Sequence, residues 1–197
     1  MSEEEERQER DRTSEEQERR LRPKVWIASL SDYSVGHLHG AWAEADQEEE
    51  GLWNDINEVL RTSPTPGAEE WAIFDYEDFG PLRLAEYESV ERITRLGRGI
   101  GEHGEAFAAF AHFLSDEDEM LGQFEDCYLG EWESAEAYVD ELVDDLGIDR
   151  LLDEHVPESW RPYVRVDSEG LARDMQIEGS LLAIDGSEGN VFLFHPP

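Results

Sequence analysis

Short runs of β-branched and aromatic residues around one helical pattern predict a ββαβ unit near the N-terminus. The runs 25–30 (VWIASL) and 38–43 (LHGAWA) predict two hairpin strands joined by a turn at 31–34, and 71–76 (WAIFDY) predicts a third strand. Between the second and third strands, the apolar positions share the spacing of one helical face: Leu52, Trp53, Ile56, Val59 and Leu60. The proline and glycine cluster at 63–67 is expected to end this helix.

The middle of the chain has helical patterning. Ser89 is placed to cap a helix with apolar positions at 90–96, and the glycines of 97–101 (GRGIG) are expected to end it. A second apolar stripe covers 107–114. The segment 115–119 (SDEDE) then predicts a capped acidic helix start, because carboxylates favour the first turn of a helix.

The C-terminal third has mixed patterning. We expect a strand at 127–132 (CYLGEW), a helix over 134–147, a helix around 171–175 and two final strands at 177–184 and 191–194. This order of elements is typical of the α+β class and predicts two or three small subdomains.

Composition separates the N-terminal segment from the rest of the chain. Residues 1–22 hold nine acids and six arginines with almost nothing apolar, so they cannot bury surface and are expected to form a flexible charged tail. We therefore predict a tail at 1–22, a ββαβ-like N-terminal subdomain at 23–86, a helical middle subdomain at 87–126 and an α+β C-terminal subdomain at 127–197.

The overall charge narrows the classes of function. The 197 residues carry 50 acids against 16 bases, a formal net charge of −34, yet 39% are apolar and 10% aromatic, so the chain should fold. Phosphates would be repelled, which excludes a nucleic-acid binder with basic patches and disfavours an anionic membrane surface. No apolar run approaches the roughly 18 residues of a membrane span. No signal peptide is recognisable, and the single Cys127 fits a reducing compartment, so we expect a cytoplasmic protein.

The distribution of charge suggests that a partner recognises the acidic side chains themselves. Residues 25–60 hold eight acids, residues 99–149 hold 16, and neither stretch contains a lysine or arginine. Such an excess of negative charge destabilises a compact state by self-repulsion. This cost suggests that the negative electrostatic field has a function. B-DNA carries one negative charge per about 1.7 Å of axis, so the 31 net charges outside the tail would match about 50 Å of duplex. The pattern predicts an acidic decoy for a basic DNA-binding groove, with an acidic surface throughout.

Residues that could carry chemistry have simpler interpretations. The acids at 116–119 lack the spacing of a calcium loop, and His37 and His39 have no third ligand at diagnostic spacing. Cys127 has no histidine–asparagine partnership and is interpreted as a buried structural thiol. The 97–101 glycines lack the Lys-Ser/Thr of a phosphate loop. We expect a protein that is not an enzyme, with no catalytic residues, cofactor or metal.

A second interpretation of the many acidic residues stays open. Adaptation to a salty cytoplasm would also give many acids and few lysines, and Lys24 is the only lysine of the chain. The alternative is a salt-adapted acidic interaction domain with no DNA-related partner. A carboxylate-dependent hydrolase is a more distant third, because 50 carboxylates bring some pair close by composition alone.

Several segments together resemble a known family. The runs 24–30 (KVWIASL), 38–42 (LHGAW) and 70–77 (EWAIFDYE) resemble the N-terminal blocks of the ArdA antirestriction proteins. Further blocks agree in order: 86–89 (EYES), 138–147 (YVDELVDDLG), 156–163 (VPESWRPY), and 172–175 (ARDM) followed by Gly179. The charged tail and the extra length around 48–68 depart from the family. The arginines of 83–98 interrupt any continuous acidic stripe.

The resemblance implies an elongated, curved homodimer of three small domains, with the C-terminal domain making the dimer. Proteins of this family are inhibitors that imitate DNA and occupy the DNA-binding groove of type I restriction-modification enzymes. They are typically encoded on mobile genetic elements. The implied partners are the methyltransferase core of such an enzyme and a second copy of the chain, without direct binding to nucleic acid or membrane.

We expect outward-facing carboxylates to stand in for phosphates and to pair with lysines and arginines of the target through many weak contacts. The candidates are Glu44, Asp46, Glu48, Glu49, Glu50, Asp55, Glu58, Glu69, Glu70, Asp75, Glu77, Asp78, Glu102, Glu105, Asp116, Glu117, Asp118, Glu119, Glu125, Asp126, Glu131, Glu133, Glu136, Asp140, Glu141, Asp144, Asp145 and Asp149.

Overall fold

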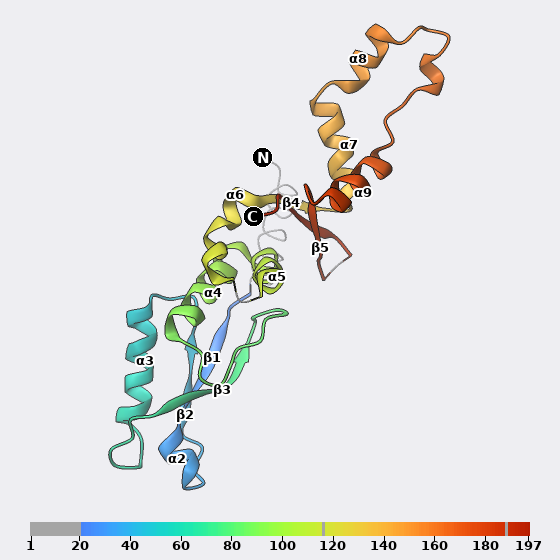
Figure 1. Cartoon of the computed structure of the whole chain (residues 1–197). Coiled ribbons are helices and arrows are strands. Elements are labelled where there is room, and N and C mark those ends of the chain that lie inside the picture. The colour runs from blue at the N-terminus through green and yellow to red at the C-terminus, as the bar shows by residue number, and fades with distance from the viewer. Residues whose placement is uncertain (1–20, 116, 188) are drawn as a thin grey trace, which may run out of the picture. The chain divides into compact units, whose positions relative to one another are not determined.

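The computed structural model describes residues 21–115, 117–187 and 189–197 and contains helices and two three-stranded antiparallel sheets (Figure 1). The predicted α+β class is confirmed. The described chain forms two compact units that divide between Asp118 and Glu119. The predicted tail at 1–22 lies outside the described residues except for its last two positions. The division of the remainder into three subdomains stays a prediction.

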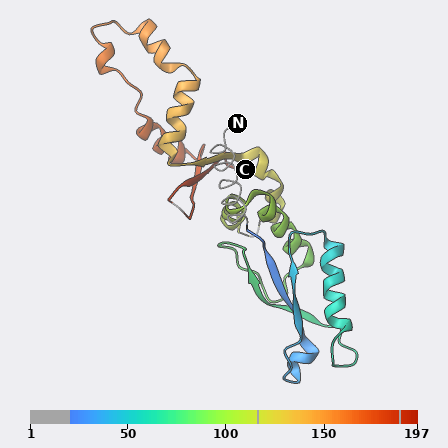
Figure 2. The same ribbon diagram turned by 180° about the vertical axis from the view of Figure 1, so that it is seen from behind.

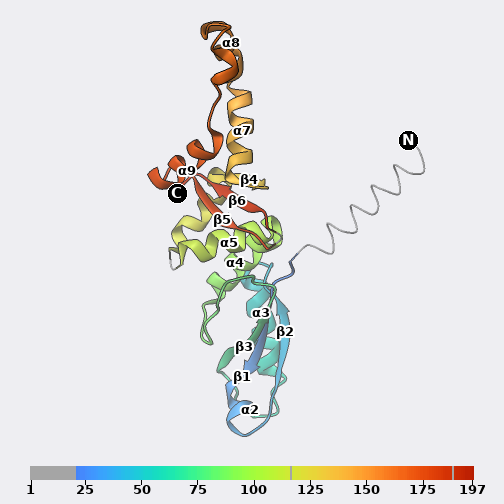
Figure 3. The same ribbon diagram turned by 90° about the vertical axis from the view of Figure 1, so that its right-hand side faces the viewer.

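The first unit is built on the sheet β2-β1-β3, with β1 in the centre. Its elements are β1 (Lys24–Ser29), α2 (Leu30–Ser34), β2 (Gly40–Glu44), α3 (Glu49–Arg61), β3 (Trp71–Glu77), α4 (Val90–His103) and α5 (Glu105–Leu114). α3 packs along β1 and β2 (Figures 1 and 3) and buries Leu52, Ile56 and Val59, as its helical spacing predicts.

The glycine-rich stretch of α4 does not end the helix, contrary to expectation. α4 runs on to His103, and its glycines allow other parts of the chain to approach closely. A Cβ at Gly97 would lie 2.2 Å from the carbonyl oxygen of Ala45, and a Cβ at Gly99 would lie 2.2 Å from the Phe107 ring of α5. Packing therefore offsets the helix-propensity cost of about 1 kcal/mol per glycine.

The second unit is built on the sheet β4-β6-β5. Its elements are α6 (Phe124–Cys127), β4 (Tyr128–Trp132), α7 (Ala135–Asp145), α8 (Ile148–His155), the 3₁₀ turn η2 (Arg161–Tyr163), α9 (Ser168–Glu178), β5 (Leu182–Asp185) and β6 (Val191–Phe194), while the 3₁₀ turn η1 (Asp118–Gln123) spans the division. The chain leaves β4 through α7 and α8 and returns over residues 156–167 to α9, which packs on α7 (Figure 2).

Three local expectations are wrong. The expected turn at 31–34 belongs to α2, because the Ser29 side chain accepts a hydrogen bond from the Asp32 backbone N–H and caps a short helix. Ser115 does not begin an acidic helix; it ends α5 with a φ of 60°. The strand expected at 177–184 begins only at Leu182, since α9 extends to Glu178 and ends at Gly179 in the left-handed conformation. In addition, α8 follows Gly147, where no helix was expected.

Candidate functional site

Nearly all the candidate carboxylates point to solvent. Among those in the described residues, Glu105 and Asp118 are half-buried and the others are exposed, while Asp116 lies outside the described residues. They sit on helices α3 to α8, on the 3₁₀ turn η1, on strands β2, β3 and β4, and on the loops between elements. Burial of the apolar helix faces leaves these side chains outward, so helical spacing alone places many of them.

Helix α7 has the densest regular array. Its exposed carboxylates are Glu136, Asp140, Glu141, Asp144 and Asp145. Residues four apart on a helix lie on one face about 6 Å apart along the axis, so Glu136, Asp140 and Asp144 form one row. Glu141 and Asp145 form a second row. Five carboxylates over the 11 residues of α7 give about one charge per 3.3 Å of axis, close to the roughly 3.4 Å per phosphate of one DNA strand.

The ends of α7 are fixed as the sequence predicts. The Ser134 side chain accepts a hydrogen bond from the backbone N–H of Ala137 at 3.1 Å and caps the first turn. Gly147 follows the helix with a φ of 64°, a conformation that glycine adopts without a steric penalty. Both rows of carboxylates therefore sit on a helix with defined ends.

Helix α3 also presents carboxylates, but two of them have partners within the chain. Arg61 donates hydrogen bonds to both carboxylate oxygens of Glu58 and thereby lowers the pKa of that carboxyl. Asp55 accepts a hydrogen bond from Gln47 Nε2 at 2.8 Å. By contrast, none of the five α7 carboxylates has an ion pair or hydrogen bond to another side chain in the described part of the chain. Within the described residues, the α7 carboxylates therefore have fewer side-chain partners than those of α3.

The arginines of α4 are engaged within the first unit. Arg92 pairs with Asp118 and lies 3.8 Å from Glu88, and its side chain is only 18% exposed. Arg95 pairs with Glu91 one turn away. Arg98 Nη1 lies 2.7 Å from Glu48 Oε1. These cations neutralise particular carboxylates locally, so they are not a separate basic patch.

The only lysine is likewise engaged. Lys24 Nζ lies 2.9 Å from Glu77 Oε2 and 4.9 Å from the centre of the Trp42 ring. The hydrogen bond with Glu77 raises the pKa of Lys24 against the opposing effect of burial. In the second unit, Arg161 pairs with Asp149 at 3.0 Å and also with Asp153.

One buried carboxylate was not singled out from the sequence. Asp32 is fully buried in α2 and accepts hydrogen bonds from Ser63 Oγ at 2.6 Å and from the Thr65 backbone N–H at 3.2 Å. Burial alone would raise the pKa of Asp32, but these hydrogen bonds and the nearby His39 outweigh it and lower that pKa to about 2. Asp32 ties the loop after α3 to α2 and is a structural group.

The other side chains considered for chemistry also have structural contacts. His37 and His39 lie in the loop before β2, not on a strand, and the His39 Nε2 atom is 2.9 Å from the carbonyl oxygen of Val59. Cys127 is buried, and burial raises the pKa of its thiol, as expected of a structural cysteine.

The candidate carboxylates chosen from the sequence do not include every exposed carboxylate. In the second unit the omitted ones include Glu158, Glu169, Asp174, Glu178 and Asp185. In the first unit, Glu86 is exposed beside β3 and lines a groove with aromatic residues. The acids of the former group stand singly and form no charge run, and no local signal in the sequence places Glu86 next to those rings.

The fold and this surface define the chain as an acidic α+β protein whose carboxylates face outward on small sheet-and-helix units. Within the described residues, no helix combines the length and the apolarity that crossing a membrane requires. The family model of the antirestriction protein ArdA matches residues 25–188, and the chain therefore belongs to the ArdA antirestriction family. A comparison with curated proteins gives no match.

Proposed function

We propose that this protein inhibits type I restriction-modification enzymes by occupying the DNA-binding groove of their methyltransferase core with carboxylates in place of phosphates. The observation that carries the proposal is the exposed carboxylate array of α7, whose mean charge per length of helix axis is close to that of one DNA strand. Membership of the antirestriction family supports it. The protein acts by binding, as a non-enzymatic competitor in the cytoplasm, without cofactor or metal.

The binding energy is spread over many contacts. An exposed ion pair contributes about 0.2–1 kcal/mol, and 1.4 kcal/mol corresponds to a tenfold change in affinity. Replacing one α7 carboxylate by its amide should therefore weaken binding by less than about fivefold. Replacing all five should weaken it by roughly 100-fold.

The test is competition with DNA for a purified type I methyltransferase core. The variant carries Glu136→Gln, Asp140→Asn, Glu141→Gln, Asp144→Asn and Asp145→Asn. The matched control removes five exposed charges elsewhere in the second unit, with Glu158→Gln, Glu169→Gln, Asp174→Asn, Glu178→Gln and Asp185→Asn. We expect the α7 variant to lose far more displacement of DNA than the control.

Salt gives an independent readout of the same mechanism. Binding through exposed charges weakens as ionic strength rises, because counterions screen each pair. Displacement of DNA by the wild-type protein should therefore fall between 50 and 300 mM salt after correction for the salt dependence of DNA binding itself. An inhibition constant indifferent to salt would rule out phosphate imitation.

We also propose that the protein forms a homodimer through the second unit. Its exposed large apolar residues are Leu146, Leu151, Trp160, Tyr163, Leu171 and Ile177, and α8 buries none of its residues. Dimerisation would cover apolar side chains that are otherwise exposed to water, which is favourable. Sedimentation should give a dimer at micromolar concentration, and Trp160→Ser with Tyr163→Ser should shift it to monomer. A wild-type monomer at that concentration would contradict the dimer.

The scarcity of lysine keeps the salt-adapted interaction domain as the alternative function. That alternative predicts unfolding at low salt, whereas an inhibitor that works at ordinary ionic strength must stay folded there. Thermal melts from 20 mM to 2 M salt separate the two.

A further inference from the structure

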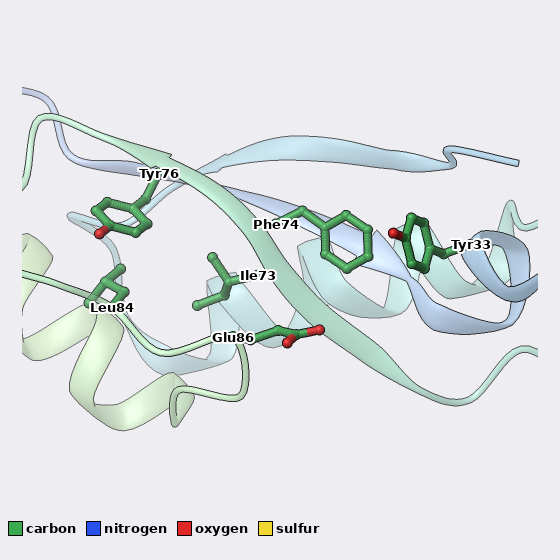
Figure 4. Close-up of a pocket in the computed structure, with 6 residues that line it drawn as sticks. All are labelled: Tyr33, Ile73, Phe74, Tyr76, Leu84 and Glu86. Carbon is green, nitrogen blue, oxygen red and sulfur yellow. The ribbon is translucent and has the colours of Figure 1, made fainter. Parts of the chain in front are cut away.

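A surface of different chemistry lies on the first unit beside β3. A groove of about 390 Å³, called the β3 groove below, is lined by Tyr33, Ile73, Phe74, Tyr76, Leu84 and Glu86 (Figure 4). Tyr33 comes from α2 and the next three from β3. The last two come from the segment after β3, which is held alongside it where the Ile73 backbone N–H donates to the carbonyl of Glu86 at 2.9 Å.

A β-bulge gives this groove its aromatic wall. Successive residues of a regular strand point to opposite faces, so Ile73 and Phe74 would not line one groove. In β3, however, Asp75 is opposite Trp26 and Ile73 is opposite Ile27, which leaves Phe74 as the extra residue. Bulges redirect side chains and are frequent beside functional sites. Phe74 here meets Tyr33 edge to face, with ring centroids 4.8 Å apart.

Among the described residues that line the groove, Glu86 is the only one with a charged side chain, and its carboxylate lies beside β3 (Figure 4). Tyr33 is 60% exposed, so a partner can reach this end of the groove. The local field is negative: the charge of Glu86 raises the pKa of the neighbouring Tyr87, with contributions from burial and from Glu70. Ring surfaces next to a carboxylate favour a flat cation, which stacks on the rings and pairs with the acid.

We propose that the β3 groove receives an arginine side chain of the protein partner, with the guanidinium against Tyr33 and Phe74 and paired with Glu86. The identity of that partner as a restriction-modification enzyme rests on the proposed function. A guanidinium fits better than an ammonium because it is planar, weakly hydrated and able to form two parallel hydrogen bonds to a carboxylate. DNA offers phosphates but no aromatic groove, so this contact gives the inhibitor affinity that phosphate imitation alone does not supply.

The groove can be tested without any restriction enzyme. N-acetyl-arginine amide is titrated into the full-length protein while the ring protons of Tyr33 and Phe74 are followed by NMR. N-acetyl-citrulline amide, of similar shape but uncharged, is the matched control. We expect saturable ring shifts with the arginine amide, none with the citrulline amide, and loss of the shifts in Glu86→Gln. Absence of shifts with arginine, or equal shifts with citrulline, overturns the proposal.

The competition assay with the methyltransferase core tests the same groove in the complex. Tyr33→Ala and Glu86→Gln should each weaken displacement of DNA about tenfold. Glu158→Gln, which removes one exposed charge far along the chain from the groove residues, should change it less than twofold. Unchanged displacement by both groove variants overturns the proposal and leaves the proposed function standing. If the wild-type protein does not displace DNA, the proposed function fails and the ring shifts still decide the groove.

Two other occupants are outcomes of the same tests. If Tyr33→Ala changes the sedimentation of the free protein, the groove is a contact between copies. If deletion of residues 1–20 shifts the Tyr33 ring signals without added ligand, the chain's own N-terminal segment fills the groove. Either result overturns the proposal that a partner's arginine binds there.

Discussion

The two units carry their carboxylates on cores of different depth. In the first unit, α4 and α5 bury residues along their whole length, from Val90 to Gly101 and from Ala106 to Leu114. In the second unit, α7 buries only Val139, α9 buries only Ser168 and Ala172, and α8 buries nothing. Helices of the second unit therefore give most of their surface to solvent or to partners, and we expect this unit to be the less stable one.

Aromatic contacts between the sheet of the second unit and the helices α6 and α7 help to hold this unit together. The rings of Phe124, Tyr128 and Phe194 pack with centroids 5.0 to 5.9 Å apart, and Trp132 meets Tyr138 edge to face at 5.3 Å. Aromatic pairs of this kind stabilise by about 0.5–1.5 kcal/mol beyond the area that they bury. The comparison predicts that a small number of ring contacts decides whether the α7 array is presented at all.

The largest expected effect is the loss of one ring from this cluster. Phe194 and Phe110 are both fully buried, one in each unit, and Phe→Ala in a core costs about 3–5 kcal/mol. We expect Phe194→Ala to unfold the second unit and Phe110→Ala to weaken a first unit that stays folded. Hydrogen exchange resolved by segment measures both. Loss of protection throughout the chain in either variant would contradict separate stabilities for the two units.

A second prediction sharpens the close approach that the first unit depends on. Gly97→Ala would place a Cβ against the Ala45 backbone, which cannot move as a side-chain end can, and overpacking of this kind costs about 1–3 kcal/mol. Gly122→Ala is the matched control in the second unit, because its Cβ would meet no atom within 4 Å. Urea unfolding should show a lower midpoint for the first variant and an unchanged or higher midpoint for the second.

This glycine also marks where prediction from sequence ends. Period and capping were sufficient for α3, α7 and the start of α4, because Leu52, Ser134 and Ser89 act within one or two helical turns. Gly97 was expected to break the helix. Its packing role could not be predicted, because its partner Ala45 is distant in sequence and the contact is with the backbone. Short helices such as α2 were not predicted, because they are too short to show a full helical period of apolar residues.

The same distinction applies to the candidate site: features set by local spacing were predicted, and features that depend on distant contacts were not. The α7 carboxylates were identified from the sequence because helical period alone turns them outward, although their assignment to DNA imitation stays a prediction. The β3 groove was not identified, because it needs the register of β3 on β1, which produces the bulge at Phe74, and the return of Glu86 alongside β3. Asp32 was missed for a similar reason, since its partners Ser63 and Thr65 belong to a distant loop.

A third prediction uses pH to separate the units. The folded pKa of Asp32, about 2, lies below its ordinary value of 3.8, so the charged form stabilises the first unit above about pH 4. That contribution is lost as pH falls through 2. Asp32→Asn should lower the melting temperature of the first unit by a few degrees at pH 7, and the difference from wild type should shrink between pH 4 and 2. A difference that is constant with pH would show that the carboxylate charge is not what stabilises this loop.

The smallest expected effects come from exposed ion pairs, and they too differ between the units. Arg150 in α8 is 84% exposed and pairs with Glu154 at 3.1 Å, so Arg150→Gln should change the melting temperature by less than about 2 °C. Arg92, at 18% exposure between Glu88 and Asp118, is screened less by salt, and Arg92→Gln should cost more. Melts at 50 mM and 500 mM salt check both. The effect of Arg150→Gln should vanish at the higher salt while that of Arg92→Gln persists, because only the second arginine would leave carboxylates behind in a partly buried setting. Equal effects for the two variants at both salt concentrations would mean that burial does not distinguish these pairs, and that the first unit owes its greater expected stability to its apolar core alone.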